Sequence, residues 1–238
     1  MRVIATSLLS VLLAGCASGP DGTTDPATTT PEPELPRATY SWVWLHAGGA
    51  EETISQEDLE AAQAGHFASM RRLADDGELL LAGPLWPPRA VASHRGVFLF
   101  RRGSMANVLE LAGSDPAVQA GLLRMEVEPF AADADLATAA RRHAEWVAAS
   151  GVEDPPPGLH SHGYVLLVGR PAVAARRALQ ASELPVLFHG TLGSGASLSE
   201  LACLDYRSVD DLPGALPGGD TVAWTAMAWF STEELGAL

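Results

Sequence analysis

Apolar residues recur along residues 56–76 at the spacing of a helix with one buried face. From Leu59 the apolar or histidine positions fall at 62, 66, 70 and 73, which places His66 on the stripe facing the protein interior. Ser55 and Asp58 have capping-box spacing, and Gly77 suits the left-handed residue that ends a helix. The pattern therefore predicts a helix from about residue 56 to 76 that directs His66 inward.

Short apolar runs on both sides of this helix predict strands. "YSWVWLH" from residue 40 is apolar on both faces, as in an interior strand. "ELLLAGPL" predicts a buried strand over 79–82 that opens into a turn at Gly83 and Pro84. The next elements are a strand at 95–102, short helices from Ser104 to Ala112 and from Asp115-Pro116, and a strand from 123. The expected order is βαββαβ.

The first sixteen residues, "MRVIATSLLSVLLAGC", have one basic residue, an apolar run and small residues before a cysteine, as in a secretion signal. Leu13-Ala14-Gly15-Cys16 resembles the lipobox of bacterial lipoproteins, which implies cleavage after residues 1–15 and a lipid on Cys16. The alternatives are an uncleaved anchor helix or an ordinary secretory signal, although the run is short for a membrane span.

The lipobox implies a lipid-anchored protein of the cell envelope. Its partner would be a membrane, reached through Cys16. In a Gram-negative cell this is the outer membrane or periplasmic face, and in a Gram-positive cell it is the surface. Residues 16–37 are rich in Thr and Pro with little to bury, so they predict a disordered tether.

The amino-acid composition excludes several kinds of chemistry and partner. The 238 residues are 47% hydrophobic, enough for a packed core, and carry 15 basic against 29 acidic residues, a formal charge of -14. All fifteen basic residues are arginine, which excludes lysine-based nucleophiles, and the acidic balance argues against nucleic acid as a partner. Besides Cys16 the chain has only Cys203, so we expect no intramolecular disulfide and a buried packing role for Cys203.

Residues from about 40 to 131 resemble the YCII-related family. The resemblance rests on His66, on "LLLAGPL" and "RGVFLF", on "DPAVQAGLLRMEVEPF" and on their order and spacing. It implies a small ferredoxin-like α+β domain of the kind that pairs into an α+β barrel. A histidine and an aspartate are the proposed catalytic centre of that family, and they match His66 and Asp115 here. We also expect Gly83, Pro84 and Trp44 to contact a substrate.

The His66–Asp115 pair also has a chemical rationale of its own. An imidazole beside a carboxylate is held in one tautomer and becomes a better base, which suits proton abstraction from carbon, or addition and elimination. The alternative is that His66 is a core histidine and that Asp115-Pro116 is an ordinary helix start. The large rings of Trp42 and Trp44 could also fill the pocket.

The middle of the chain is expected to connect two folded parts. Residues 132–150 are alanine-rich and predict a helix, and a Pro-rich loop follows, so 132–162 links two parts of the chain. His160 and His162 would share one strand face, and His189 can approach them. A His-x-His without a nearby acid or thiol pair is a weak metal signal, so we expect no metal and no cofactor.

From residue 163 the pattern of the first half recurs, so 163–238 is expected to be a degenerate copy of 38–131. When Gly190 is aligned with Gly83, Val173 matches His66, and Ala215 matches Asp115 when the last strands are aligned. The copy has therefore lost both groups. We expect tandem ferredoxin-like repeats that close an α+β barrel within one chain, a monomeric pseudo-dimer.

Two functions follow from these expectations. The first is an envelope lipoprotein that binds a small organic molecule and catalyses proton-transfer, isomerase or lyase-type chemistry through His66 and Asp115. The second is a non-catalytic envelope binding or interaction protein that retains only the fold. A catalytic site needs the pair at the wall of an open pocket, whereas a binding role tolerates a filled interior.

Overall fold

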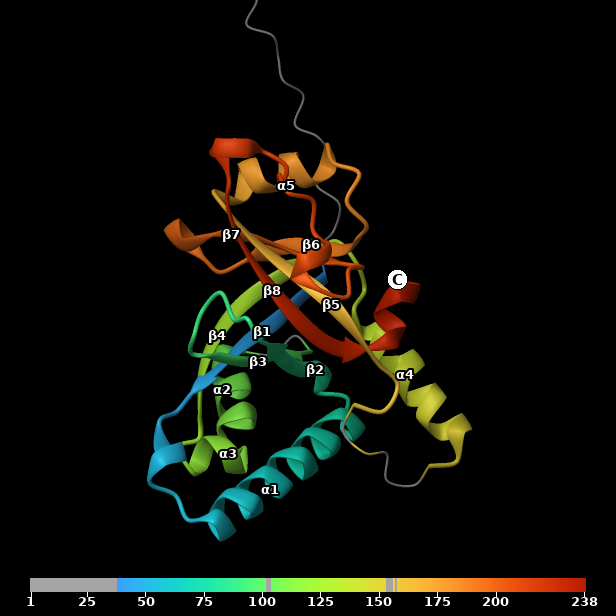
Figure 1. Cartoon of the computed structure of the whole chain (residues 1–238). Coiled ribbons are helices and arrows are strands. Elements are labelled where there is room, and N and C mark those ends of the chain that lie inside the picture. Colours follow the sequence, from blue (N-terminus) through green and yellow to red (C-terminus); the bar gives the residue numbers. More distant parts are fainter. Residues whose placement is uncertain (1–37, 102–103, 153–155, 157) are drawn as a thin grey trace, which may run out of the picture. The chain divides into compact units, whose positions relative to one another are not determined.

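Eight antiparallel strands form one closed barrel in the order β1-β3-β2-β8-β5-β7-β6-β4 (Figure 1). The computed structural model describes residues 38–101, 104–152, 156 and 158–238. The predicted signal (1–15), the tether (16–37) and Cys16 lie outside these residues. The strands are β1 Ala38–Ala47, β2 Leu79–Trp86, β3 His94–Phe100, β4 Leu123–Ala132, β5 Ser161–Arg170, β6 Val186–Leu192, β7 Ser199–Leu204 and β8 Ala223–Thr232.

The helices lie outside the barrel or at its end. They are α1 Gln56–Asp75, α2 Met105–Gly113, α3 Pro116–Gln119, α4 Ala137–Ser150 and α5 Ala172–Gln180. Short 3-10 helices are η1 Ala50–Glu52, η2 Gly195–Ser197, η3 Val209–Asp211, η4 Gly219–Thr221 and η5 Glu233–Ala237. In the described part of the chain, none of the helices has the length and apolar character that a membrane crossing requires.

The helices α1 and α3 both begin at a residue whose side chain caps the helix, as the sequence indicated. Ser55 accepts a hydrogen bond from the Asp58 N–H at 3.1 Å, which caps α1 as its spacing predicted. Asp115 accepts one from the Ala117 N–H at 2.9 Å, and Pro116 occupies the first position of α3. These caps fix where both helices begin.

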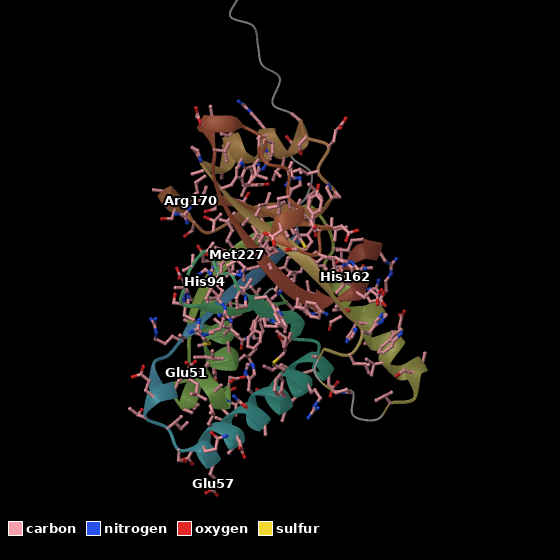
Figure 2. All side chains as sticks on the ribbon, viewed as in Figure 1. Glu51, Glu57, His94, His162, Arg170 and Met227 are labelled. Carbon is pink, nitrogen blue, oxygen red and sulfur yellow. The ribbon has the colours of Figure 1, made fainter. Side chains whose placement is uncertain are left out.

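Aromatic and aliphatic side chains fill the barrel interior. Trp42, Phe130, Tyr164 and Trp229 are almost completely buried there, and the rings of Trp42 and Trp229 lie 6.1 Å apart. Met227 of β8, labelled in Figure 2, belongs to the same cluster. Cys203 is also buried in it, as expected, and burial raises the pKa of its thiol. The two tryptophans anticipated on β1 therefore occupy interior space.

A second apolar layer lies on the outer face of the barrel, over the strands of the first half. Val43, Phe98 and Phe100 point away from the barrel interior and pack with Leu73 of α1 and Val108 of α2. The outer face of the second half is covered in part by α5, whose Leu179 packs with strand residues. The strands β1, β3, β5 and β7 thus have both faces buried, which explains why they are apolar on both sides.

Segments after β4 and β8 also pack on the interior cluster. Leu136, Ala139 and Leu235 are fully buried in it, and α4 lies beside η5 (Figure 1). The Tyr164 hydroxyl donates to the carbonyl of Thr232 at 3.0 Å. The connecting segment is therefore part of the packed structure.

Two expected element boundaries were wrong. β2 continues to Trp86, so Gly83 and Pro84 lie in a strand and not in a turn, because β2 pairs with β8 at Leu85. The connecting helix begins at Ala137 and not at 132, because β4 extends to Ala132 to pair with β6.

Two smaller expectations also differ. The third strand ends at Phe100 and not at 102. His160 does not share a strand face with His162, because its φ of 56° places it before β5 begins.

The two halves follow the same strand order. In the first, β1 lies between β4 and β3, and β2 follows β3. In the second, β5 lies between β8 and β7, and β6 follows β7. The halves differ between their last two strands, where the first has α2 and α3 and the second has 3-10 turns.

Candidate functional site

His66 and Asp115 are in direct contact. The His66 Nδ1 lies 2.9 Å from Oδ1 and 2.8 Å from Oδ2 of Asp115. The Asp115 side chain is only 1% exposed, whereas that of His66 is 17% exposed. A buried carboxylate at Nδ1 favours the tautomer whose proton is on Nδ1, which leaves the Nε2 lone pair available.

A close approach of α1 to α3 creates this contact. A Cβ added at Gly65 would lie 2.8 Å from Cγ of Pro116, so only glycine permits the spacing. Pro116 directly follows Asp115, and Gly65 directly precedes His66. The glycine and the proline therefore set the two functional side chains against each other.

Aromatic rings surround the histidine. The His66 ring stacks on Phe98 with centroids 5.8 Å apart and an interplanar angle of 21°, and Phe67 lies 5.5 Å away. Among the described residues, no hydrogen-bond partner is found for Nε2. The geometry gives an oriented imidazole with one free nitrogen at a partly exposed aromatic wall.

The residues expected to contact a substrate, Gly83, Pro84 and Trp44, do not gather around His66 and Asp115. Phe98 lies opposite Val43 and Trp44 lies opposite Val97, so Phe98 and Trp44 point to different faces of the sheet. Trp44 and Gly83 therefore belong to the barrel side, whereas His66 lies on the helix-covered side. Pro84 is exposed on β2. The structure brings together His66 and Asp115 but separates them from Trp44.

The positions that match the pair in the second half carry no such site. Val173 is 61% exposed on α5, and Ala215 lies in an exposed turn. A different polar cluster occupies the outer face there. Glu200 is fully buried and contacts Arg176 Nη2 at 2.9 Å and His189 Nδ1 at 2.6 Å. His189 Nε2 lies 3.2 Å from Asp133, and Arg176 also bonds Thr191.

Sequence reasoning missed this cluster. Its members come from β4–α4, α5, β6 and β7, so no local spacing relates them. The only local signal was the glutamate within the apolar run 198–204, because a carboxylate in a buried strand needs partners. The cluster sits beside the β4–β6 pairing, where it fits a structural role.

The three histidines of the second half that the sequence singled out, His160, His162 and His189, also lie beside carboxylates. His160 lies 3.0 Å from Glu233 and 2.9 Å from Glu234, and its ring stacks on Trp146 at 4.0 Å. His162, on β5 (Figure 2), lies 3.4 Å from Asp205. His189 is in the Glu200 cluster, so it does not join them. In the part of the chain that the structure describes, no group of three or more potential ligands has a metal-binding arrangement.

A further histidine cluster lies at the end of β1. Trp44 stacks on His94 with ring centroids 4.9 Å apart, and the His46 ring meets His94 at 4.7 Å. Burial lowers the pKa of His94, and the neighbouring His46 lowers it further, although Glu126 opposes this. Trp44 also donates to Glu128 at 2.8 Å. Trp44 is thus fixed by stacking and hydrogen bonding.

Comparisons with known proteins give little. No family model matches the sequence, and no curated protein matches it. Among solved structures, a crystal structure of an anthrone oxidase-like protein is 12% identical with a TM-score of 0.35, and the match covers 82% of this chain and 92% of that chain. The resemblance to the YCII-related family has no support from a family model.

Proposed function

We propose that this protein is an envelope-anchored lipoprotein of the YCII-related type, in which His66 acts as a general base on a small organic molecule. The reaction class is proton transfer, as in an isomerase or a lyase. Asp115 would orient His66 and stabilise its protonated form. The supporting observation is the contact of His66 Nδ1 with a buried carboxylate while Nε2 stays without a described partner.

The proposal includes the chain's organisation. Residues 38–131 and 163–238 would be tandem ferredoxin-like repeats joined by 132–162, forming a monomeric pseudo-dimer. The shared strand order of the two halves supports this. A second copy that closes the barrel replaces the identical partner that a single domain would recruit.

Anchoring at Cys16 forms a separate part of the proposal and rests on the lipobox sequence. A Cys16→Ser variant should move from the membrane fraction to the soluble fraction and should lose the lipid in mass spectrometry. Continued acylation and membrane association of that variant would contradict the assignment.

The availability of His66 as a base can be tested without knowing the substrate. Diethyl pyrocarbonate modifies the free nitrogen of an unprotonated imidazole, and mass spectrometry locates the product. We expect rapid modification of His66 and slower modification in Asp115→Asn, because the amide no longer stabilises the positive charge. Asparagine also caps helices well, so α3 should persist. His162, 19% exposed and also beside a carboxylate, is the internal control.

Catalysis itself can be followed as hydrogen–deuterium exchange at carbon. Acetylacetone and oxaloacetate serve as carbon-acid probes in D2O, with NMR detection. His66→Gln should slow any catalysed exchange by about 100-fold, the usual scale of general-base catalysis, while His162→Gln should not. Equal exchange in the parent protein and in His66→Gln, or a His66 that diethyl pyrocarbonate does not reach, would refute the catalytic role.

The filled barrel interior favours the second function, non-catalytic binding in the envelope. Trp42 and Trp229 occupy the space in which a barrel of this size would hold a ligand. In that case His66 and Asp115 only join α1 to α3. The exchange experiment separates the two functions, because the non-catalytic protein accelerates none of the probes.

A further inference from the structure

A surface pocket of about 280 Å³ lies where β2 meets β8. Two aromatic residues, Trp86 and Phe230, and two polar residues, Arg207 and Ser208, contribute to its lining. The volume is close to the lower end of the roughly 300–1,000 Å³ that ligand sites occupy. The pocket therefore suits a molecule of one or two rings.

The pairing of β2 with β8 brings the two aromatic rings together. Trp86 lies opposite Ala228, and Phe230 is two residues further along β8, so all three side chains share the outer face. The rings of Trp86 and Phe230 are 6.0 Å apart at an angle of 51°. Trp86 is 54% exposed, so its ring is accessible to a ligand from solvent.

A glycine brings the polar residues to the same place. Gly163 of β5 pairs with Phe230, and a Cβ added at Gly163 would lie 3.0 Å from the carbonyl oxygen of Arg207. The chain after β7 therefore passes close over β5 beside Phe230. This approach places Arg207 and Ser208 at the aromatic rings.

The charge of the pocket differs from that of the chain. Arg207 is the only ionic group among the lining residues, in a protein with a formal charge of -14. No carboxylate among the described residues forms an ion pair with Arg207. Ser208 Oγ accepts from the Asp210 N–H at 3.2 Å, which leaves its own O–H able to donate. Asp211 binds the Ser208 N–H and is not a lining residue.

We propose that this pocket binds a small aromatic carboxylate. The ring of the ligand packs on Trp86 and Phe230, and its carboxylate accepts hydrogen bonds from the Arg207 guanidinium and the Ser208 hydroxyl. Guanidinium groups match carboxylates in shape and charge, whereas a neutral amide cannot replace that interaction. This site is separate from His66 and does not rest on the proposed function.

The test uses benzoate, its uncharged isostere benzamide, and cyclohexanecarboxylate, which keeps the charge without the aromatic ring. Two-dimensional NMR of the tryptophan indole N–H groups resolves the six tryptophans, and Trp86→Phe assigns the Trp86 signal. Benzoate should shift the Trp86 signal in a saturable manner. Benzamide and cyclohexanecarboxylate should each bind at least about tenfold more weakly.

Matched variants locate the carboxylate contact. Arg207→Gln should weaken benzoate binding about tenfold and leave benzamide unchanged, whereas Arg177→Gln, an exposed arginine on α5, should change neither. Trp86→Ala should weaken the binding of both benzoate and benzamide, which calorimetry measures in this variant. Equal binding of benzoate and benzamide, no saturable shift of Trp86, or an equal effect of the two arginine variants would overturn the proposal.

Discussion

Glu200 has no exposed surface, yet its pKa lies below the ordinary value for a glutamate. Burial alone raises the pKa of this carboxyl, but hydrogen bonds from His189 and Arg176, together with their positive charge, lower it by more. The carboxylate form is therefore the one that the folded state stabilises. A group with a depressed folded-state pKa contributes stability above its unfolded pKa and loses it as the pH falls.

Acid should therefore destabilise the protein partly through Glu200. Its contribution is fully present above the ordinary pKa of 4.5 and is lost as the pH falls through the lower folded-state value. Glu200→Gln should reduce the free energy of unfolding at pH 7 by roughly 3 kcal/mol, because Arg176 and His189 lose their buried partner. Below pH 4.5 the difference between parent and variant should shrink.

Urea denaturation between pH 7 and 3 measures this effect. Glu145→Gln, a change at an exposed glutamate of α4, is the matched control and should leave the unfolding free energy within about 0.5 kcal/mol of the parent. A gap between parent and Glu200→Gln that stays constant down to pH 3 would show that ionisation of Glu200 does not support the fold.

At the scale of elements, local sequence signals located most of the structure. The caps at Ser55 and Asp115 predicted the starts of α1 and α3, and the apolar runs located the strands of both halves. The two larger errors occur where a partner from the other half extends a strand. Gly83 and Pro84 have turn chemistry, but pairing with β8 keeps β2 extended to Trp86. Such pairing depends on residues more than 140 positions away.

Local sequence signals also predicted only part of the candidate site. Helical periodicity indicated that His66 faces the protein interior, but the barrel wall beside it is buried on both faces, and periodicity does not tell which of the two a helix residue meets. Trp44 was expected to share a site with His66, and it lies on the other face of the sheet. The contacts of the Glu200 cluster could not be predicted, because they join residues from α5, β6, β7 and the segment after β4.

At the scale of the whole molecule, two short seams close the barrel. β2 pairs with β8 through two residue pairs, and β4 pairs with β6 through three. A glycine lies at each seam. A Cβ at Gly83 would lie 1.6 Å from the carbonyl oxygen of Phe230, and one at Gly190 would lie 2.3 Å from that of Ala131. The glycines that aligned in the two halves thus have the same role, which is to let the backbone of the other half approach.

Substituting either glycine by alanine should therefore open its seam. Both contacts involve backbone atoms, which cannot move aside as a flexible side chain can. We expect Gly83→Ala and Gly190→Ala each to lower the free energy of unfolding by at least about 2 kcal/mol, as overpacking does in cores. An opened barrel also exposes its apolar interior, so both variants should form dimers or larger species in size-exclusion chromatography.

Gly214→Ala is the matched control for both seams. No atom lies within 4 Å of the position that its Cβ would take, so this variant should stay within about 0.5 kcal/mol of the parent and elute like it. Any general effect of removing a glycine from the unfolded chain would appear in all three variants alike. If both seam variants are as stable as Gly214→Ala, the two halves do not meet through these glycines. If only one of them loses stability, the strands at the other seam can move apart without destabilising the protein.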